Sequence, residues 1–452
     1  MAVWTTPNSK ELGKAGRWDA EAYTPFLRGL DAKFQKSPRL CDLATVTHAA
    51  EITRIYSDAS DAKLFLLAQN IRPLLPDTST EFRISKDSAK AIPTNRLNHG
   101  DVLVTPTGAH SGMSAVYLGH DGDCYTSGEG LILRSRGSID GPYLATFLNT
   151  TAGQALCRRA IYGSGQPHIG PKYLEQIRIP RLKDVEENAS ALVRAAWNEI
   201  QSAETLYPAA EAELLDRIGW KDLQNQPQEL SYGRDFSDLG AAQRVDAEFF
   251  QPQYTRLHAR LRELHAVTCK HVIHFVRRGT QPVYDEMGSV LAITEKHLTS
   301  TFMNYDGALR VSENFWRSNP SAQVQRGDTL IYSIGAFIGR ANVYYGEAKA
   351  ITTSNTGIIR PTNRINPGYL ALFLNSPPGL MQAKQFSCSS GQGALPPEFI
   401  KRFLIFLPHR SDGKIDFAWQ KRLADKVEAA VNAKAAARAK LEEAKRIVEN
   451  AI

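Results

Sequence analysis

Few side chains in this 452-residue sequence have the types and spacing that a catalytic or metal site needs. Its 11 histidines are scattered and show no metal-ligand spacing. Its five cysteines are single and widely spaced, so they predict neither a disulfide framework nor a zinc site. We expect them to be small buried hydrophobic side chains in a reducing compartment. They are Cys41, Cys124, Cys157, Cys269 and Cys388.

Two short stretches carry part of a catalytic pattern. The segments Pro76–Asp77 and Glu81–Arg83 partly match a nuclease carboxylate motif, but their spacing is short and the second half of the chain has no counterpart. The stretch Asn375–Gly379 (NSPPG) is close to the Asn-Pro-Pro-aromatic loop of amino-methyltransferases but lacks the aromatic residue. No glycine-rich nucleotide loop follows a predicted strand. The chain is therefore not expected to bind S-adenosylmethionine, ATP or a metal itself, and a single-chain DNA methyltransferase or nuclease is the alternative hypothesis.

A repeated stretch is the main feature of the sequence. Gly100–Gly119 (GDVLVTPTGAHSGMSAVYLG) recurs 227 positions later as Gly327–Gly346 (GDTLIYSIGAFIGRANVYYG) without a gap. The identical residues are mostly glycines, the Gly-Asp pair and apolar positions, whereas His110-Ser111 is replaced by Phe337-Ile338. This pattern indicates one scaffold that is used twice with different surfaces, which suits recognition better than catalysis.

The repeat extends over the rest of the chain. Upstream, Leu12–Glu21 matches Leu239–Glu248, and downstream Tyr143–Thr150 (YLATFLNT) matches Tyr369–Ser376 (YLALFLNS) after a slip of one residue. A period of this length has the size of a domain rather than of a solenoid repeat. The sequence therefore predicts a tandem duplication of one domain.

Each copy reads as a mixed α/β body. In the first, helices are predicted at Ala20–Lys33, Tyr143–Asn149 and Gln154–Ala160, strands within Gly100–Tyr117, and a short strand at Ile177–Pro180. In the second, the expected elements are a helix near Ala247–Leu264, strands within Asp328–Tyr345, a helix at Tyr369–Leu374 and a last strand at Phe403–Leu407.

A long glycine-free helix follows each body. The first is predicted from Asp184 to about Ile218, with a kink or restart at Pro208 and an end at Gly219, and the second covers Phe417–Ile452. Both carry an apolar stripe of alanine and leucine, which must be buried. We expect the two helices to pair with each other as an antiparallel coiled coil.

Charge is distributed unevenly along the chain. The formal net charge is +7, and both bodies are basic, whereas residues 182–225 contain four basic and nine acidic side chains. Basic bodies are compatible with a polyanionic partner. No apolar run approaches the length of a membrane span and the N-terminus does not resemble a signal peptide, so a soluble, cytoplasmic protein without a membrane partner is expected.

These motifs together resemble the specificity subunit of type I restriction–modification enzymes. The resemblance consists of Gly-Asp followed by Gly-Ala-x-x-Gly, then Tyr-Leu-Ala-x-Phe-Leu-Asn, then Ser-Gly-Gln ahead of an aliphatic-Pro strand end, then a long helix, all present twice. It implies an α/β (α+β) chain with target recognition domains at 1–182 and 226–415 and spacer helices at 183–225 and 416–452.

The resemblance implies a non-catalytic subunit that reads double-stranded DNA. Each recognition domain would read one half of a bipartite, asymmetric target, and the helices would set the distance between the halves. Two adenine methyltransferase subunits that use S-adenosylmethionine would dock on the chain, and ATP-dependent restriction subunits would join for cleavage. A related methylation-linked antiviral defence system is an alternative context.

Candidate DNA-contacting residues are polar or basic side chains near the repeated turns. For each one, a solvated surface charge or a local loop hydrogen bond is the competing explanation. Gln166 and Gln392 occur in both copies, so they could serve the loop or a phosphate rather than sequence reading. The candidates are His110, Ser111, Arg134, Arg158, Arg159, Gln166 and His168 in the first body, and Arg277, Arg278, Arg340, Lys384, Ser389, Ser390 and Gln392 in the second.

Overall fold

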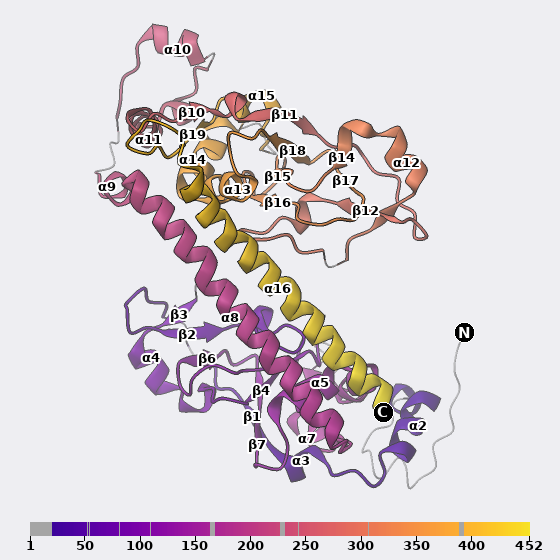
Figure 1. Cartoon of the computed structure of the whole chain (residues 1–452). Helices are drawn as coiled ribbons and strands as arrows, with labels where there is room; N and C mark the ends of the chain where they lie inside the picture. Colours follow the sequence, from indigo (N-terminus) through magenta and orange to yellow (C-terminus); the bar gives the residue numbers. More distant parts are fainter. Residues whose placement is uncertain are drawn as a thin grey trace. The chain divides into compact units, whose positions relative to one another are not determined.

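The computed structural model divides into two compact units, each with its own sheets and helices (Figure 1). It describes residues 20–51, 53, 55–80, 82–108, 110–162, 168–226, 231–242, 244–305, 307–387 and 393–452. The first unit comprises the chain up to Gln201 together with Lys434–Ile452, and the second comprises Ser202–Ala433. Each long helix is therefore shared between the units, whereas the sequence-based boundaries gave each helix a segment of its own.

The main sheet of the first unit has four antiparallel strands in the order β1-β7-β4-β5. A smaller sheet has the order β3-β2-β6, in which β2 and β6 are parallel, and β8 pairs with β9. The strands are β1 (Ala44–His48), β2 (Lys63–Leu66), β3 (Arg83–Ile84), β4 (Val102–Val104), β5 (Ser114–Val116), β6 (Cys124–Thr126), β7 (Leu131–Ser135), β8 (Ile161–Tyr162) and β9 (His168–Ile169).

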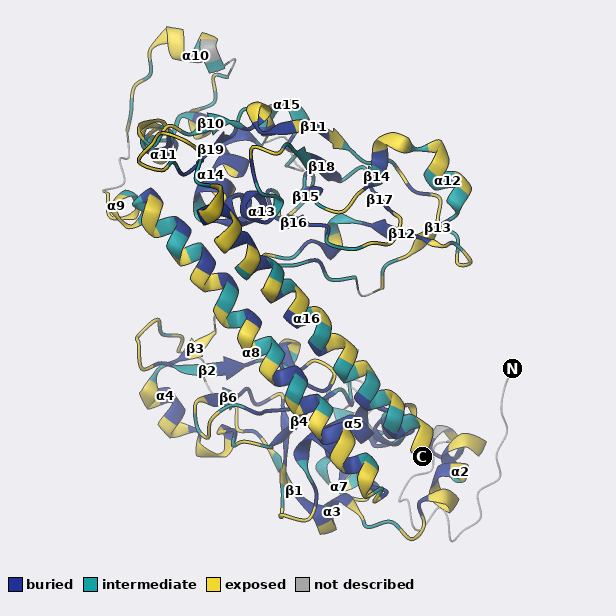
Figure 2. Cartoon of the chain, viewed as in Figure 1, coloured by how far each residue is buried: buried dark blue, intermediate teal, exposed yellow. Residues whose placement is uncertain are grey.

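Helices of the first unit pack on the main sheet and bury its apolar side chains. Ala89 packs instead on the smaller sheet, with Phe65 and Ile84. Helix α5 is buried at every position, which Figure 2 shows in dark blue. The helices are α2 (Pro25–Lys33), α3 (Leu40–Leu43), α4 (Lys86–Ala91), α5 (Gly141–Asn149), α6 (Thr151–Arg159) and α7 (Pro171–Leu174), with 3-10 turns η1 (Ala20–Tyr23), η2 (Ala68–Asn70) and η3 (Pro93–Asn95).

The second unit repeats this topology. Its main sheet has the order β11-β18-β15-β16, and a second sheet has the order β13-β12-β17-β14 with β12 and β17 parallel. The strands are β10 (Val267–Thr268), β11 (Ile273–Arg278), β12 (Val290–Ile293), β13 (Arg310–Val311), β14 (Gln323–Val324), β15 (Thr329–Tyr332), β16 (Ala341–Val343), β17 (Ala350–Thr352), β18 (Thr356–Pro361) and β19 (Leu404–Ile405). The common strand order supports the duplication that the sequence predicts.

Helices again cover the main sheet of the second unit. Phe315 and Trp316 pack instead on the second sheet, with Val290 and Val311. The helices of this unit are α9 (Trp220–Gln224), α10 (Phe236–Ala242), α11 (Pro252–Glu263), α12 (Glu313–Ser318), α13 (Pro367–Asn375), α14 (Pro377–Phe386) and α15 (Pro397–Ile400). The 3-10 turns are η4 (Ala247–Phe250), η5 (Cys269–His271), η6 (Glu295–His297) and η7 (Pro320–Ala322).

Two predicted elements differ in detail from the structure. The helices expected at Ala20–Lys33 and Ala247–Leu264 are each interrupted just before a proline, because a residue that precedes proline disfavours helical backbone. Thr24 and Gln251 are extended, with ψ of 152° and 139°, and a new helix starts at the next residue. The strand expected at Ile177–Pro180 is only an isolated bridge between Arg39 and Arg178, because its partner segment turns into α3.

The repeated tyrosine of the Tyr-Leu-Ala-x-Phe-Leu-Asn helix has the same bond in both units. The Tyr143 hydroxyl donates to the carbonyl oxygen of Pro180 at 2.7 Å, and the Tyr369 hydroxyl donates to that of Phe406 at 2.7 Å. Each bond ties the helix to the segment that ends its body. A buried hydroxyl without this partner would cost free energy, so the tyrosine is structural.

The repeated asparagine holds the neighbouring strand. Asn149 donates to the Ser114 carbonyl oxygen at 2.7 Å, and Asn375 donates to the Ala341 carbonyl oxygen and accepts from the Ala341 amide at 2.8 Å. The two asparagines therefore fix the helix against β5 and β16 in the same way. The motif that carries the resemblance is a packing device rather than a chemical site.

The two long helices are α8 (Asp184–Ile218) and α16 (Phe417–Ala451). Pro208 lies inside α8, which continues through it without a restart, and Gly219 follows with a left-handed φ of 74°. Segments of both helices share the core of the first unit through Val193 and Val448 among others. In the second unit, Leu214 and Leu423 lie in one core.

Oppositely charged side chains connect the helix segments inside each unit. Lys440 bonds to Glu199 at 3.0 Å in the first unit. In the second, Glu213 pairs with Lys426 at 3.1 Å and with Arg422. The acidic first helix and the basic second helix are therefore complementary where they meet, while a coiled coil along their whole length stays a prediction.

Candidate nucleic-acid interface

The turn between β4 and β5, and its copy between β15 and β16, is built on glycines. Gly108 and Gly112 have φ of 80° and 89°, and Gly335 and Gly339 have φ of 127° and 96°. These values lie in the left-handed region, where a side chain is strained. The repeated spacing of the glycines therefore specifies the shape of the turn, and the residues between them are left to vary.

Each turn lies directly against the second of the two packed helices. A Cβ atom on Gly112 would lie 2.8 Å from Cys157 Cβ on α6, and one on Gly339 would lie 2.5 Å from Ala383 Cβ on α14. The side chain of Gln154 also donates to the Gly112 carbonyl oxygen at 2.8 Å. The glycines thus let the turn and the helix approach each other closely.

A third segment joins the turn in each unit. The Ile169 amide of β9 donates to the Pro106 carbonyl oxygen at 2.8 Å, and the Leu395 amide donates to the Ser333 carbonyl oxygen at 2.8 Å. The turn, the helix and the segment after the helix therefore meet in both units. We call this place the turn face.

In the first unit, the turn face brings together several sequence-predicted residues. His110 and Ser111 lie in the turn, Arg158 lies in the last turn of α6, and His168 lies on β9. His110 and Arg158 are exposed, but the Ser111 hydroxyl donates to the Gly108 carbonyl oxygen at 2.7 Å and so serves the turn. Arg159 pairs with Asp31 on α2 at 2.7 Å.

In the second unit, the turn face includes Arg340 in the turn and Lys384 on α14. Arg277 and Arg278 lie on β11, two strands from β15 across β18. Arg277 and Lys384 are exposed. Four predicted residues lie outside the described part of the chain: Gln166, Ser389, Ser390 and Gln392.

Arg134 is held by an internal partner. Its guanidinium donates to Asp101 through Nε at 2.9 Å and Nη2 at 2.7 Å. Arg360 makes the same forked pair with Asp328, at 2.8 Å for both bonds. Both aspartates are buried, and hydrogen bonding to them raises the pKa of Arg134 and of Arg360.

This pair explains the aspartate of the repeated Gly-Asp motif. Asp101 also accepts a hydrogen bond from the Asn98 amide at 2.8 Å, and Asp328 accepts one from the Gln325 amide at 2.8 Å. Each aspartate thereby closes the tight turn before its strand. The sequence predicts Arg134 as a DNA contact, but the structure shows its guanidinium bound to Asp101. Its counterpart Arg360 is found at an offset of 226 rather than 227, and that slip was the signal that could have marked the arginine as part of the scaffold.

Aromatic rings support two of the predicted arginines in the second unit. The Arg340 guanidinium carbon lies 3.7 Å from the Phe337 ring centroid, and that of Arg277 lies 4.2 Å from the Phe275 centroid. Burial lowers the pKa of Arg340. Phe275 and Phe337 were not predicted as site residues, although Phe337 occupies a position that differs between the copies.

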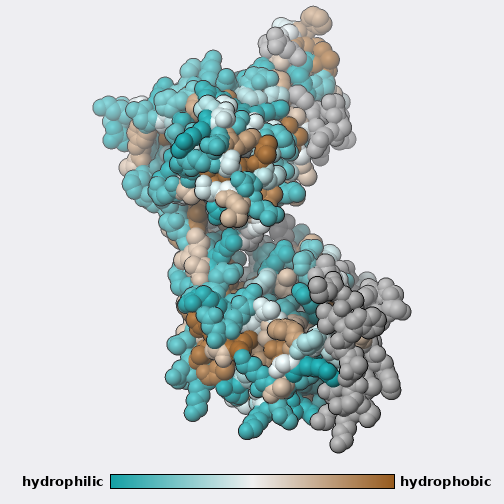
Figure 3. Space-filling model, turned by 90° about the vertical axis from the view of Figure 1, so that its right-hand side faces the viewer, coloured by the Kyte–Doolittle hydropathy of each residue, from teal (hydrophilic) through white to brown (hydrophobic). Residues whose placement is uncertain are grey.

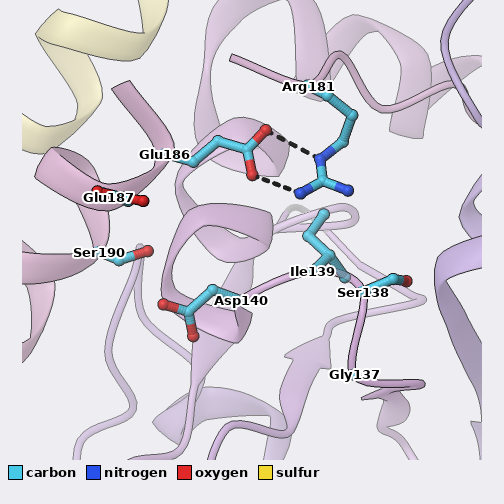
Figure 4. Close-up of a pocket in the computed structure, with 8 residues that line it drawn as sticks. All are labelled: Gly137, Ser138, Ile139, Asp140, Arg181, Glu186, Glu187 and Ser190. Atoms are coloured by element: carbon cyan, nitrogen blue, oxygen red, sulfur yellow. Dashed lines mark hydrogen bonds and ion pairs between the residues drawn. The ribbon is translucent and has the colours of Figure 1, made fainter. Parts of the chain in front are cut away.

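A pocket of about 330 Å³ lies in the first unit at the start of α8 (Figure 4). Within it, Arg181 donates to both carboxylate oxygens of Glu186 at 2.9 and 2.8 Å, and Asp140 is paired with Arg194. Three of its charged side chains, Asp140, Arg181 and Glu186, are thus held in structural ion pairs. The pocket is lined by Gly137, Ser138, Ile139, Asp140, Arg181, Glu186, Glu187 and Ser190.

Within the described ranges, no three or more His, Cys, Asp or Glu side chains gather in a way that could hold a metal ion. Across the same residues, no helix is both long and apolar enough to cross a membrane. The face drawn in Figure 3 is mostly hydrophilic, and its hydrophobic side chains lie in small separate groups.

Comparison with known proteins gave matches among solved structures alone. No family model and no curated protein sequence matches the chain. The S subunit of a type I restriction–modification system from M. genitalium matches with a TM-score of 0.44 and 11% identity, over 92% of this chain and 94% of that chain. The HsdS subunit from Thermoanaerobacter tengcongensis matches with a TM-score of 0.28 and 14% identity, over 92% and 94%.

A different class of protein matches a shorter part. The type IIG restriction endonuclease BpuSI is 12% identical with a TM-score of 0.31, over 48% of this chain and 35% of that chain. Three of the matched structures, each aligned over 92% of this chain, come from type I restriction–modification systems.

Proposed function

We propose that this chain is the DNA specificity subunit of a type I restriction–modification complex or of a related methylation-linked defence complex. The observation that carries the proposal is the duplication of one scaffold with different turn residues. Both units share the strand order, the Asp–Arg fork and the helix clamps, yet His110 and Met113 in one turn face correspond to Phe337 and Arg340 in the other.

Two equal scaffolds with unlike surfaces suit a bipartite target with two unlike halves. Basic side chains around each turn face would contact phosphates, and polar side chains in the turns would read base edges. The chain itself would bind neither S-adenosylmethionine nor ATP. Those cofactors belong to two methyltransferase subunits and to ATP-dependent restriction subunits that assemble on the chain in the cytoplasm.

The proposal is tested by sequencing the methylated bases of cells with and without the gene. The expected result is one bipartite methylated motif with unlike halves that disappears when the gene is deleted. An unchanged methylation pattern in the deletion strain would contradict a role in target choice.

A second measurement separates this proposal from a single-chain enzyme. The purified chain is incubated with DNA and S-adenosylmethionine, and separately with DNA and Mg²⁺. Neither methylation nor cutting is expected until the methyltransferase subunits are added, and activity of the chain alone would overturn the non-catalytic role. The mass of the co-expressed complex should correspond to two methyltransferase subunits per chain, because each repeat would offer an equivalent docking surface.

A further inference from the structure

We propose that Arg340 reads a guanine in the half of the DNA target that the second unit binds. The inference rests on the proposed function and adds to it a base, a half-site and a residue. It starts from an arrangement of three side chains in the β15–β16 turn: Tyr332, Phe337 and Arg340.

Phe337 contacts both of the other side chains. The Arg340 guanidinium lies over the Phe337 ring at 3.7 Å, and the Phe337 ring meets the Tyr332 ring edge-on, with centroids 6.2 Å apart and planes at 87°. Phe337 remains 51% exposed although it is a large apolar side chain. The exposed ring thus supports the arginine at the surface instead of joining the core.

The backbone of the turn fixes the position of Arg340. The Tyr332 amide donates to the Arg340 carbonyl oxygen at 2.8 Å, and the Arg340 amide donates to the Phe337 carbonyl oxygen at 3.3 Å. The preceding Gly339 packs against Ala383 so closely that a Cβ would lie 2.5 Å from that side chain's Cβ. The guanidinium is therefore presented from a rigid hairpin, which reduces the entropy lost on binding.

Among the described residues, Arg340 pairs with no carboxylate. Other arginines of the same unit are neutralised, for example Arg360 by Asp328 and Arg410 by Asp412. Stacking covers one face of the guanidinium and leaves the donors on its edges available. Two donors on one edge match the O6 and N7 acceptors of guanine in the major groove.

The corresponding positions of the first unit lack this array. Thr105, His110 and Met113 stand where the second unit has Tyr332, Phe337 and Arg340. The first unit therefore has neither the ring support nor the guanidinium at this place. The difference predicts that the guanine belongs to one half-site, the half bound by the second unit.

A DNA phosphate can accept the same two hydrogen bonds from the guanidinium, so the experiment has to distinguish contact with a base from contact with the DNA backbone. The full-length chain and its variants select sequences from a random DNA pool, and the methylated motif of the assembled complex is sequenced in parallel. Arg340→Ala should lose preference for guanine at one position of one half-site by roughly 5- to 100-fold, as expected for one bidentate contact, and leave the other half unchanged. Arg340→Lys keeps the positive charge but loses the planar fork, so its preference for guanine should be weaker than that of the wild type.

Two more variants complete the test. Phe337→Ala should weaken the same preference, because it removes the support of the guanidinium, while Arg410→Ala removes an equal charge elsewhere and should leave the motif as it was. If Arg340→Ala lowers affinity equally for all sequences and reduces the salt dependence, the arginine contacts a phosphate and the inference fails. If the wild-type chain selects no motif at all, the proposed function fails instead.

Discussion

A buried aspartate in each repeated Gly-Asp motif holds the hairpin of its own unit together. Asp101 and Asp328 are each 2% exposed, while their partners Arg134 and Arg360 have side chains 46% and 27% exposed. Removing the arginine leaves a buried carboxylate without its counter-charge. Arg360→Ala should therefore lower the free energy of unfolding by about 2–4 kcal/mol, and Arg134→Ala by less, since its pair is better solvated. Urea unfolding of the two variants checks the order, and an equal or larger loss for Arg134→Ala would contradict it.

A partly buried histidine makes the stability of the second unit depend on pH. His258 on α11 stacks on Phe386 with ring centroids 6.3 Å apart, and burial, followed by the charge of Arg262, lowers its pKa to about 4. In the unfolded chain this histidine takes up a proton near pH 6.5, whereas in the folded chain it does so only near pH 4. The free energy of unfolding therefore falls as the pH drops from about 6.5 toward 4. The loss approaches about 3 kcal/mol at the lower end. In His258→Phe, the free energy of unfolding should depend less on pH between 6.5 and 4. His110→Ala, which removes an exposed histidine, is the control and should show the same pH dependence as the wild type.

At the scale of elements, the two long helices are proposed to set the gap between the half-sites. Removing Ala209–Ala212 shortens α8 by about 6 Å and rotates the part of the helix after the deletion by about 40°. The deletion also changes which residues of the two helices lie opposite each other around the Glu213 pairs with Lys426 and Arg422. Deleting Val427–Ala430 from the second helix at the same time should restore that register. The paired deletion should shorten the unspecified gap by about one or two base pairs, or abolish binding, with both half-sites unchanged. Methylation with an unchanged gap would show that the helices do not set the spacing.

At the scale of the whole molecule, the two units should read DNA independently. Each has its own core and its own turn face. Replacing residues 1–181 with the equivalent body of a related chain should therefore change one half of the methylated motif and leave the other half and the gap as they were. Sequencing the methylated bases of cells that carry the hybrid measures this, and a change in both halves would refute independent reading.

The sequence by itself determined the duplication, the order of the elements and the long helices. Local signals are strong there: Gly219 ends α8, and the glycines of the turns have positive φ, where other residues are strained. It also separated repeated scaffold residues from variable turn residues such as Phe337, because the two copies can be compared position by position.

The tertiary structure alone decided which polar side chains are used internally. Arg134 and Arg340 are both predicted as DNA contacts, yet Arg134 forms a forked pair with the buried Asp101, whereas Arg340 stacks on the exposed ring of Phe337. It also decided that each helix belongs to both units, since its two halves are buried in different cores. The Arg134–Asp101 pair and the burial of each helix in two cores depend on contacts between residues far apart in the chain, and a local pattern carries no information about which distant carboxylate or core a side chain will meet.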